Sequence, residues 1–454
     1  MFPAREEKLA YYEKQMNGNP KGRLARRLED GGLRLYYEDG DFSFPVPDDM
    51  LSMLRRGTGD RKAAEKQIRE LKYWIHRDGE NPGTAYAGDA LRARVAPAAR
   101  LQKRDCYADL ERYLYGDVKE GVCAMFGLKG TGKTTLMLQA IMGMSEEDFS
   151  RTAYYAADRR QSCHDIRSCL NSLSSQGVRY AFVDNITRLD DFIDYACIFE
   201  FLHTEKGMKV VLSGPDSISF HFTSHDELYD NLFLVHTTWM SFAEYSRLTG
   251  ILDRDYYLER GGVLYPSFEE KDLDGYIEDA VALPIEHLLK TRKLGYRQGL
   301  AENLISADEF RPFLHRLVDK ATMDFLFSIT ASLPMPQADR DILLDAVLHE
   351  YLRRNDEEYT ANDENGLEGA KCWSLSYMVG MEFFQQGKGP EYWIAVQPGI
   401  RCMLSRSILE GALQHAPFTL CSIEAREELY KSMLQAVKDR MLDDLAWYES
   451  TLAK

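Results

Sequence analysis

The sequence predicts an α/β protein built on a five-stranded parallel sheet flanked by helices, followed by a mainly helical C-terminal region. Two observations support this. Between residues 121 and 236, short apolar runs alternate with amphipathic helical segments, which is the pattern of repeated strand–helix–strand units. After residue 245, apolar residues recur mostly at helical spacing. A parallel sheet covered on both faces leaves its ligands at the C-terminal edge of the strands.

The expected strands are short, apolar and separated by helical patterns. They cover residues 121–126, 152–157, 180–183, 209–212 and 232–236, and the expected helices follow Thr134 and cover 165–173 and 190–203. A further helix over 105–115 leads into the first strand.

A glycine-rich stretch follows the first of these strands. It is Gly127-Leu128-Lys129-Gly130-Thr131-Gly132-Lys133-Thr134-Thr135, which fits G-x-x-x-x-G-K-[ST]. The glycines allow the backbone to fold around an anion and direct several N–H groups at phosphate oxygens, and the next helix directs its positive dipole end there. Lys133 would contact the β- and γ-phosphates, and Thr134 would offer its hydroxyl to Mg²⁺. The alternative is a plain glycine-rich turn between strand and helix.

Three other polar residues end expected strands. Asp184 follows the third strand and matches the Walker B position, where it would hold Mg²⁺ on the phosphates; a capping Asp is the alternative. A whole strand separates it from the loop, which is typical of the P-loop ATPase branch that carries an extra strand there. Ser213 would lie beside the γ-phosphate or would belong to a simple turn. Asp158 follows the second strand.

Several short motifs then occur in a familiar order. They are the loop, the Asp184 strand, residues 211–217, 228–230, 236–238 and 241–245, and later 397–401 and 437–444. Together they resemble the AAA+-type ATP-binding proteins of bacteria and archaea over roughly residues 104–450. The resemblance implies an ATPase core, then a winged-helix-like region, and in relatives a restriction-endonuclease-like domain. It implies ATP and Mg²⁺ as ligands, and suggests a defence or toxin–antitoxin setting.

The departures from the family pattern matter for activity. Relatives usually place a glutamate directly after the Walker B aspartate to activate water, and here that residue is Asn185. An amide positions water but does not accept its proton, so hydrolysis should be slow unless another carboxylate, for which Asp158 is the candidate, replaces it. Asn231 stands where relatives commonly carry an arginine, which removes a possible charge clamp on the γ-phosphate. The sequence ends at Lys454, before the nuclease-like fold of relatives, so no nuclease activity is expected.

The rest of the chain gives weaker expectations. Residues 1–103 are expected to form a helical N-terminal extension, with helices over 24–30 and 62–75, ahead of a core at 104–245. Helices over 250–258 and 272–291 would form a lid subdomain at 246–300. Residues 301–454 would be helical, with a possible winged helix whose wing strand is 393–396 and a final helix over 423–448.

Composition limits the function. The formal charge of −16 disfavours nucleic-acid binding, and a basic cluster at 92–104 is more simply a solvated face than a phosphate-contacting patch. Eight scattered cysteines and the lack of a long apolar run predict a cytoplasmic protein. The expected function is a slow, switch-like ATPase with a protein partner on its C-terminal region and possible oligomers. The alternatives are a non-enzymatic nucleotide-binding interaction protein and, more weakly, a small-molecule kinase.

Overall fold

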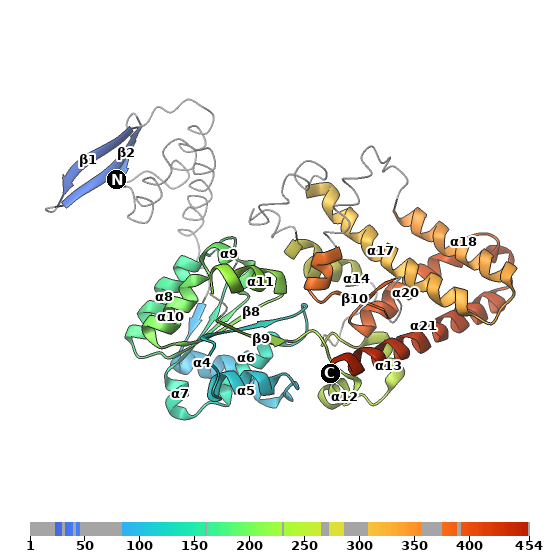
Figure 1. Ribbon diagram of the computed structural model, residues 1–454, viewed down its shortest axis with the longest axis horizontal. Coiled ribbons are helices and arrows are strands. Elements are labelled where there is room, and N and C mark those ends of the chain that lie inside the picture. The colour runs from blue at the N-terminus through green and yellow to red at the C-terminus, as the bar shows by residue number, and fades with distance from the viewer. Residues whose placement is uncertain are drawn as a thin grey trace. The chain divides into compact units, whose positions relative to one another are not determined.

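The computed structural model describes residues 23–29, 32–39, 42–45, 84–158, 161–228, 231–264, 272–285, 307–355, 375–387 and 392–452. The chain divides into two compact units (Figure 1). One comprises Met1–Thr84 and Asp158–Ser162, and the other comprises Ala85–Ala157 and Cys163–Lys454.

The first unit contains a three-stranded antiparallel sheet, in the order β1-β2-β3. The strands are β1 (Arg23–Glu29), β2 (Gly32–Asp39) and β3 (Phe42–Pro45). The helix expected over residues 24–30 is therefore wrong. Glu29 pairs with Gly32, and the sequence between these two residues is Asp-Gly, a strong hairpin signal that outweighs the helix propensity before it. The helix expected over 62–75 lies outside the described residues.

The second unit contains a mostly parallel sheet of six strands, in the order β4-β6-β7-β8-β5-β9. The strands are β4 (Thr84–Tyr86), β5 (Val122–Phe126), β6 (Thr152–Ala156), β7 (Tyr180–Asp184), β8 (Lys209–Gly214) and β9 (Leu232–His236). The five expected strands are confirmed, but the expected strand count was wrong. β4 adds a sixth at the edge, and three residues are too few to show a period in the sequence.

Helices cover both faces of this sheet (Figure 1). One face carries α4 (Gly88–Val95), η1 (Ala96–Arg100), α5 (Tyr107–Tyr115), α6 (Lys133–Met142) and α7 (Glu146–Ser150). The other carries α8 (Cys163–Ser175), η2 (Ile186–Arg188), α9 (Phe192–Tyr195), α10 (Cys197–Lys206) and α11 (Ser217–Asp226). Leu91, Val95 and Ala98 pack with α6, so residues expected in the N-terminal extension belong to this core.

Within the residues that the structure describes after Ser241, the C-terminal part is helical except for one short hairpin. It comprises α12 (Phe242–Thr249), α13 (Arg254–Arg260), α14 (Leu273–Ile277), the π-helical η4 (Glu278–Ala282), α17 (Ala307–Ser332), α18 (Gln337–Arg354), β10 (Phe384–Gln386), β11 (Trp393–Ala395), α20 (Pro398–Ala412), η5 (Phe418–Leu420) and α21 (Ile423–Leu452). The helix expected over 250–258 begins later than predicted, because α13 starts at Arg254. Gly250 is left-handed and ends α12, and Asp253 caps α13.

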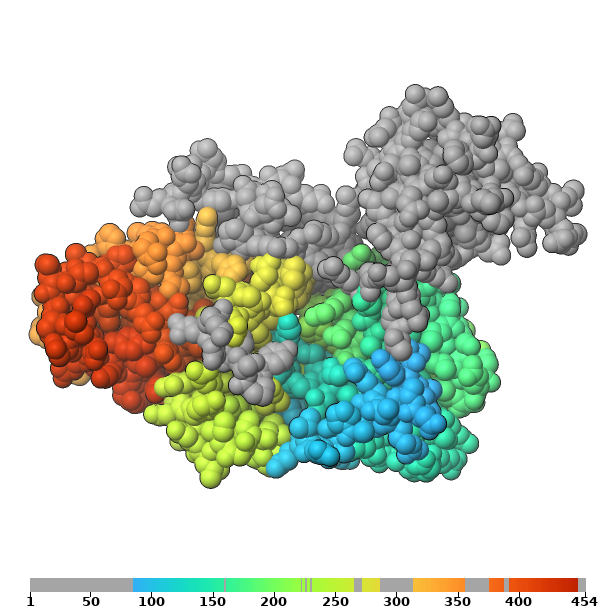
Figure 2. Space-filling model, turned by 180° about the vertical axis from the view of Figure 1, so that it is seen from behind, coloured from blue at the N-terminus to red at the C-terminus, as the bar shows by residue number. Residues whose placement is uncertain are grey.

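In Figure 2 the yellow-green segment that contains α12 and α13 lies between the blue part of the same unit and the red C-terminal helices. The part of the unit that carries the sheet shares a hydrophobic cluster with the C-terminal helices, because Leu128 and Ile218 lie in one cluster with residues of α17 and α20. No helix among the described residues is long and apolar enough to span a membrane.

Two buried ionic groups stabilise the helical part. Arg401 of α20 pairs with Asp444 of α21 at 3.3 Å, and this pair links the two C-terminal motifs found in the sequence. Glu350 of α18 is fully buried, where burial alone would raise its pKa. Hydrogen bonds from the neighbouring Arg353 and Arg354, and from His415, outweigh burial and lower the pKa of Glu350 to about 2.

Candidate functional site

The glycine-rich loop connects β5 to α6 at the C-terminal edge of the sheet. Gly127, Gly130 and Gly132 have φ values of 150°, 87° and 90°, which side chains rarely adopt. A Cβ at Gly127 would lie 2.8 Å from the backbone nitrogen of Thr238, so that position also lacks space for a side chain. The loop is therefore a tight turn at the start of a helix, as the sequence predicts.

Lys133 is the first residue of α6, and its ammonium turns back into the loop. Nζ donates to the carbonyls of Gly127 and Leu128 at 2.6 and 2.9 Å. Burial lowers the pKa of Lys133 to about 7, although the Asp184 carboxylate opposes this. A bound polyphosphate would supply further negative charge and favour the ammonium form.

Asp184 ends β7 and is buried among three hydroxyl groups. Oδ2 accepts hydrogen bonds from Thr134 Oγ1 at 2.6 Å and from the Tyr154 hydroxyl at 2.8 Å, and Oδ1 accepts one from Ser213. The structure thus brings together Thr134, Asp184 and Ser213. Tyr154 was missed, because in the sequence it is one of two tyrosines in an apolar strand. A carboxylate and a hydroxyl oxygen fit the hard-oxygen preference of Mg²⁺.

A family model described as an AAA domain matches residues 119–246. Those residues form an AAA+-type P-loop ATPase core. The core is therefore of an ATP-binding class, and the position of Lys133, Thr134 and Asp184 at one strand edge agrees with this.

The chain is also similar to solved structures, at 12–14% identity. The Hsp104–casein complex of S. cerevisiae is 12% identical with a TM-score of 0.28, covering 60% of this chain and 52% of the Hsp104 chain. Cdc6p of Pyrobaculum aerophilum is 12% identical with a TM-score of 0.25, covering 73% and 99%. A DNA replication initiation factor is 14% identical with a TM-score of 0.24, covering 78% and 96%. This chain spans about half the length of the Hsp104 chains. No curated protein matches it.

Three consecutive carbonyls of the phosphate loop of the AAA+ core are bound by donors from outside the loop. The Tyr276 hydroxyl donates to the carbonyl of Lys129 at 3.0 Å, and the Leu264 N–H donates to that of Gly130 at 3.0 Å. Arg104 donates to the carbonyl of Thr131 at 2.8 Å. The loop carbonyls are thus held by α14, the α13–α14 segment and the segment before α5.

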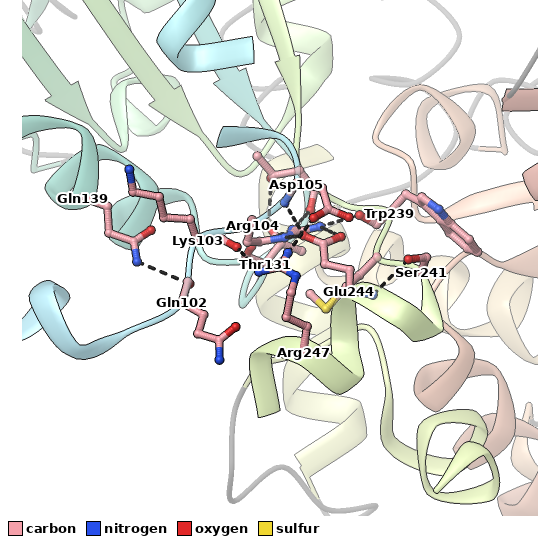
Figure 3. Close-up of polar contacts among 12 residues, drawn as sticks. Gln102, Lys103, Arg104, Asp105, Thr131, Gln139, Trp239, Ser241, Glu244 and Arg247 are labelled. Atoms are coloured by element: carbon pink, nitrogen blue, oxygen red, sulfur yellow. Dashed lines mark hydrogen bonds and ion pairs between the residues drawn. The ribbon is translucent and has the colours of Figure 1, made fainter. Parts of the chain in front are cut away.

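Arg104 is the centre of a buried polar cluster (Figure 3). Its guanidinium contacts both oxygens of Glu244 in α12, at 2.8 and 3.1 Å, and the backbone carbonyls of Thr131, Thr237 and Trp239. The prediction of a solvated basic face over residues 92–104 is wrong for Arg104, which is buried. Only the fold shows that Glu244, 140 residues away, meets it.

Asn185 and Asp158 are the two residues that the sequence suggests for positioning water. Asn185 follows Asp184 directly with a left-handed φ of 62°, and its N–H donates to Ser213 Oγ at 3.4 Å. The backbone N–H of Asp158 donates to Gln161 Oε1 at 2.9 Å, within the first unit. The roles of Asn185 and Asp158 in positioning water stay predictions.

Asn231 lies at the opposite end of β5 from the phosphate loop. Its Oδ1 accepts from the N–H of Gly121 at 2.6 Å, and its Nδ2 donates to Glu200 at 2.8 Å. Because Gly121 directly precedes β5, these bonds attach the start of that strand to its neighbours.

Proposed function

We propose that this chain binds Mg·ATP, hydrolyses it slowly, and uses the nucleotide state to change how the AAA+ core contacts the C-terminal region. The observation that carries the proposal is the hydrogen bond of 2.6 Å between Thr134 and Asp184. It places a threonine of the phosphate loop against the acidic residue at the end of β7. These are the two groups that Mg²⁺ requires on the protein side of a P-loop site.

Each side chain has a distinct role in this proposal. The N–H groups of 127–132 would bind the β- and γ-phosphates, and Lys133 would exchange its two carbonyl partners for phosphate oxygens. Bound Mg²⁺ would neutralise charge on the phosphates. Thr134 would then turn its hydroxyl from Asp184 to the metal, and Tyr154 would keep the Asp184 carboxylate oriented. Ser213 would lie at the γ-phosphate.

Asn185 predicts a slow rate unless a carboxylate from another position accepts the proton. An amide in the usual position of the activating glutamate holds water without accepting its proton, which removes a contribution of about 10²–10⁴-fold. Asp158 is the acceptor that the sequence suggests. Single-turnover hydrolysis tests both residues, because an unchanged rate in Asn185→Ala and in Asp158→Ala would exclude them from water positioning.

The switch rests on the carbonyl contacts of the loop. If phosphate binding shifts residues 129–131, the hydrogen bonds from Tyr276 and Leu264 must lengthen or move with the loop. Hydrogen exchange of residues 262–282 should therefore differ between the ATP-bound and ADP-bound states. Equal exchange in the two states would refute the switch.

Nucleotide binding itself is tested by calorimetry with Mg·ATP and Mg·ADP. Lys133→Ala should weaken ATP binding strongly, whereas Lys129→Ala should weaken it little because Lys129 pairs outward with Asp279. Asp184→Asn should keep ATP bound and slow its hydrolysis. If Lys133→Ala and wild-type protein bind ATP equally, the proposed function is wrong.

A second candidate function is a non-enzymatic nucleotide-binding protein that recognises a protein partner through its C-terminal helices. Asn185 favours it, since the usual activating carboxylate is missing from that position. ATP affinity without turnover in a single-turnover assay would select this candidate. A pull-down that compares Asp184→Asn with Lys133→Ala would then identify a partner that depends on bound ATP.

A further inference from the structure

A carboxylate from the C-terminal region lies on the phosphate-loop edge of the sheet. Residues 375–380 are helical, and Glu382 follows them just before β10. The Ser217 hydroxyl donates to the carbonyl of Gly380, and a Cβ at Gly380 would lie 3.5 Å from Ile218. This turn therefore packs on the start of α11, a few residues beyond the end of β8.

The side chain of Glu382 also contacts the end of β9. Its Oε1 lies 2.5 Å from Nδ1 of His236, the last residue of that strand. His236 pairs in register with Phe126, and the two rings meet edge to face with centroids 4.5 Å apart. Phe126 directly precedes Gly127, so Glu382 is held beside the strand that leads into the phosphate loop.

Glu382 costs stability in two ways. Its φ of 61° is left-handed, and among the described residues only Asn185 is a second non-glycine residue of this kind. The Glu382 N–H bonds to the carbonyl of Val379 in a helix-ending turn where glycine is usual, so the side chain costs about 1–2 kcal/mol. Backbone strain of this kind clusters at functional sites.

The second cost is an unpaired oxygen. Oε2 of Glu382 is buried, and no described residue makes a hydrogen bond to it. A buried acceptor without a partner costs about 1–3 kcal/mol, and an ionised carboxylate offers two lone pairs on that oxygen. The unpaired oxygen therefore belongs to a side chain that is held at the end of β9, in register with the last residue before the phosphate loop.

We propose that Glu382 is the proton acceptor for the attacking water, in place of the glutamate that Asn185 replaces and instead of Asp158. The water oxygen forms a bond to the γ-phosphorus while the bond from that phosphorus to the β–γ bridging oxygen breaks. One proton of the water passes to Oε2 of Glu382, ADP and inorganic phosphate leave, and Glu382 releases the proton to solvent. His236 holds the other oxygen and orients the carboxylate. This inference rests on the proposed ATPase function.

The test uses the full-length protein, Mg·ATP and two readouts, calorimetric affinity and single-turnover rate. E382Q keeps the size of the side chain and an acceptor for His236, so its ATP affinity should stay within about threefold. Its hydrolysis rate should fall about 100-fold or more. The matched control E428Q, an exposed glutamate on α21, should change neither readout.

A second variant separates chemistry from folding. E382G should fold at least as well as wild type, because glycine accepts the left-handed φ without strain, and it should lose hydrolysis. Added formate, a small carboxylate, should restore part of the rate in E382G and none in Lys133→Ala. A structural role for Glu382 would not produce this rescue.

The outcomes distinguish this inference from the proposed function. If wild-type protein does not bind Mg·ATP, the proposed function fails and this inference fails with it. If the protein binds ATP and E382Q hydrolyses it within threefold of wild type, only the assignment of Glu382 is wrong. Binding without any turnover by wild type would also overturn the assignment, because a positioned proton acceptor predicts measurable hydrolysis.

Discussion

The buried pair of Arg104 and Glu244 joins the segment before α5 to α12, and its removal should destabilise the second unit. Arg104→Met keeps the length of the side chain and removes the guanidinium. Glu244 then loses two hydrogen bonds, of 2.8 and 3.1 Å, and its carboxylate stays buried with the N–H of Asp105 as its one remaining donor among the described residues. Breaking a buried pair on one side costs about 3–5 kcal/mol, so the unfolding free energy should fall by about that amount.

The assay is urea unfolding followed by circular dichroism, with Arg247→Met as the matched control. Arg247 pairs with Asp105 on the surface, where such a pair contributes about 0–1 kcal/mol. In the double variant Arg104→Met, Glu244→Met, the free energy of unfolding should fall by less than the sum of the decreases in the two single variants, because no unpaired charge is left. The reasoning is refuted if Arg104→Met lowers the free energy of unfolding no more than Arg247→Met does. Direct pairing of Arg104 with Glu244 is refuted if the decreases in the two single variants add up to the decrease in the double variant.

Three other outcomes are expected. Gly127→Ala should abolish Mg·ATP binding measured by calorimetry, because its Cβ has no space and its φ is left-handed, whereas Gly275→Ala, which faces open space, should bind normally. Tyr154→Phe should fold but weaken Mg²⁺-dependent ATP binding by about tenfold, since the Asp184 carboxylate loses one orienting donor; unchanged magnesium dependence would contradict this role. The pKa of Glu350 is lowered, so its contribution to stability is complete above about pH 4.5 and is lost as the pH falls towards about 2. Over that window the unfolding free energy of Glu350→Gln should change less with pH than that of wild type.

Local sequence patterns were sufficient to predict the phosphate loop and the strands around it. The loop can be recognised from the spacing of its glycines, lysine and threonine, and the five expected strands are short apolar runs. Asp184 and Ser213 could be placed near the loop because parallel strands bring their C-terminal ends to one edge. The hairpin at 23–39 was missed because helix propensity and strand pairing compete there, and pairing depends on residues outside the window.

What the sequence alone determined is the glycine-rich turn, the helix behind it and the positions of five strands along the chain, because each depends on short-range spacing. Only the tertiary structure decided which distant side chains complete the site: Tyr154 on Asp184, Arg104 on Glu244 and the loop, and Glu382 beside His236. These contacts join residues from 30 to 146 positions apart. No local pattern encodes such pairs, since they form only when packing brings separate elements together.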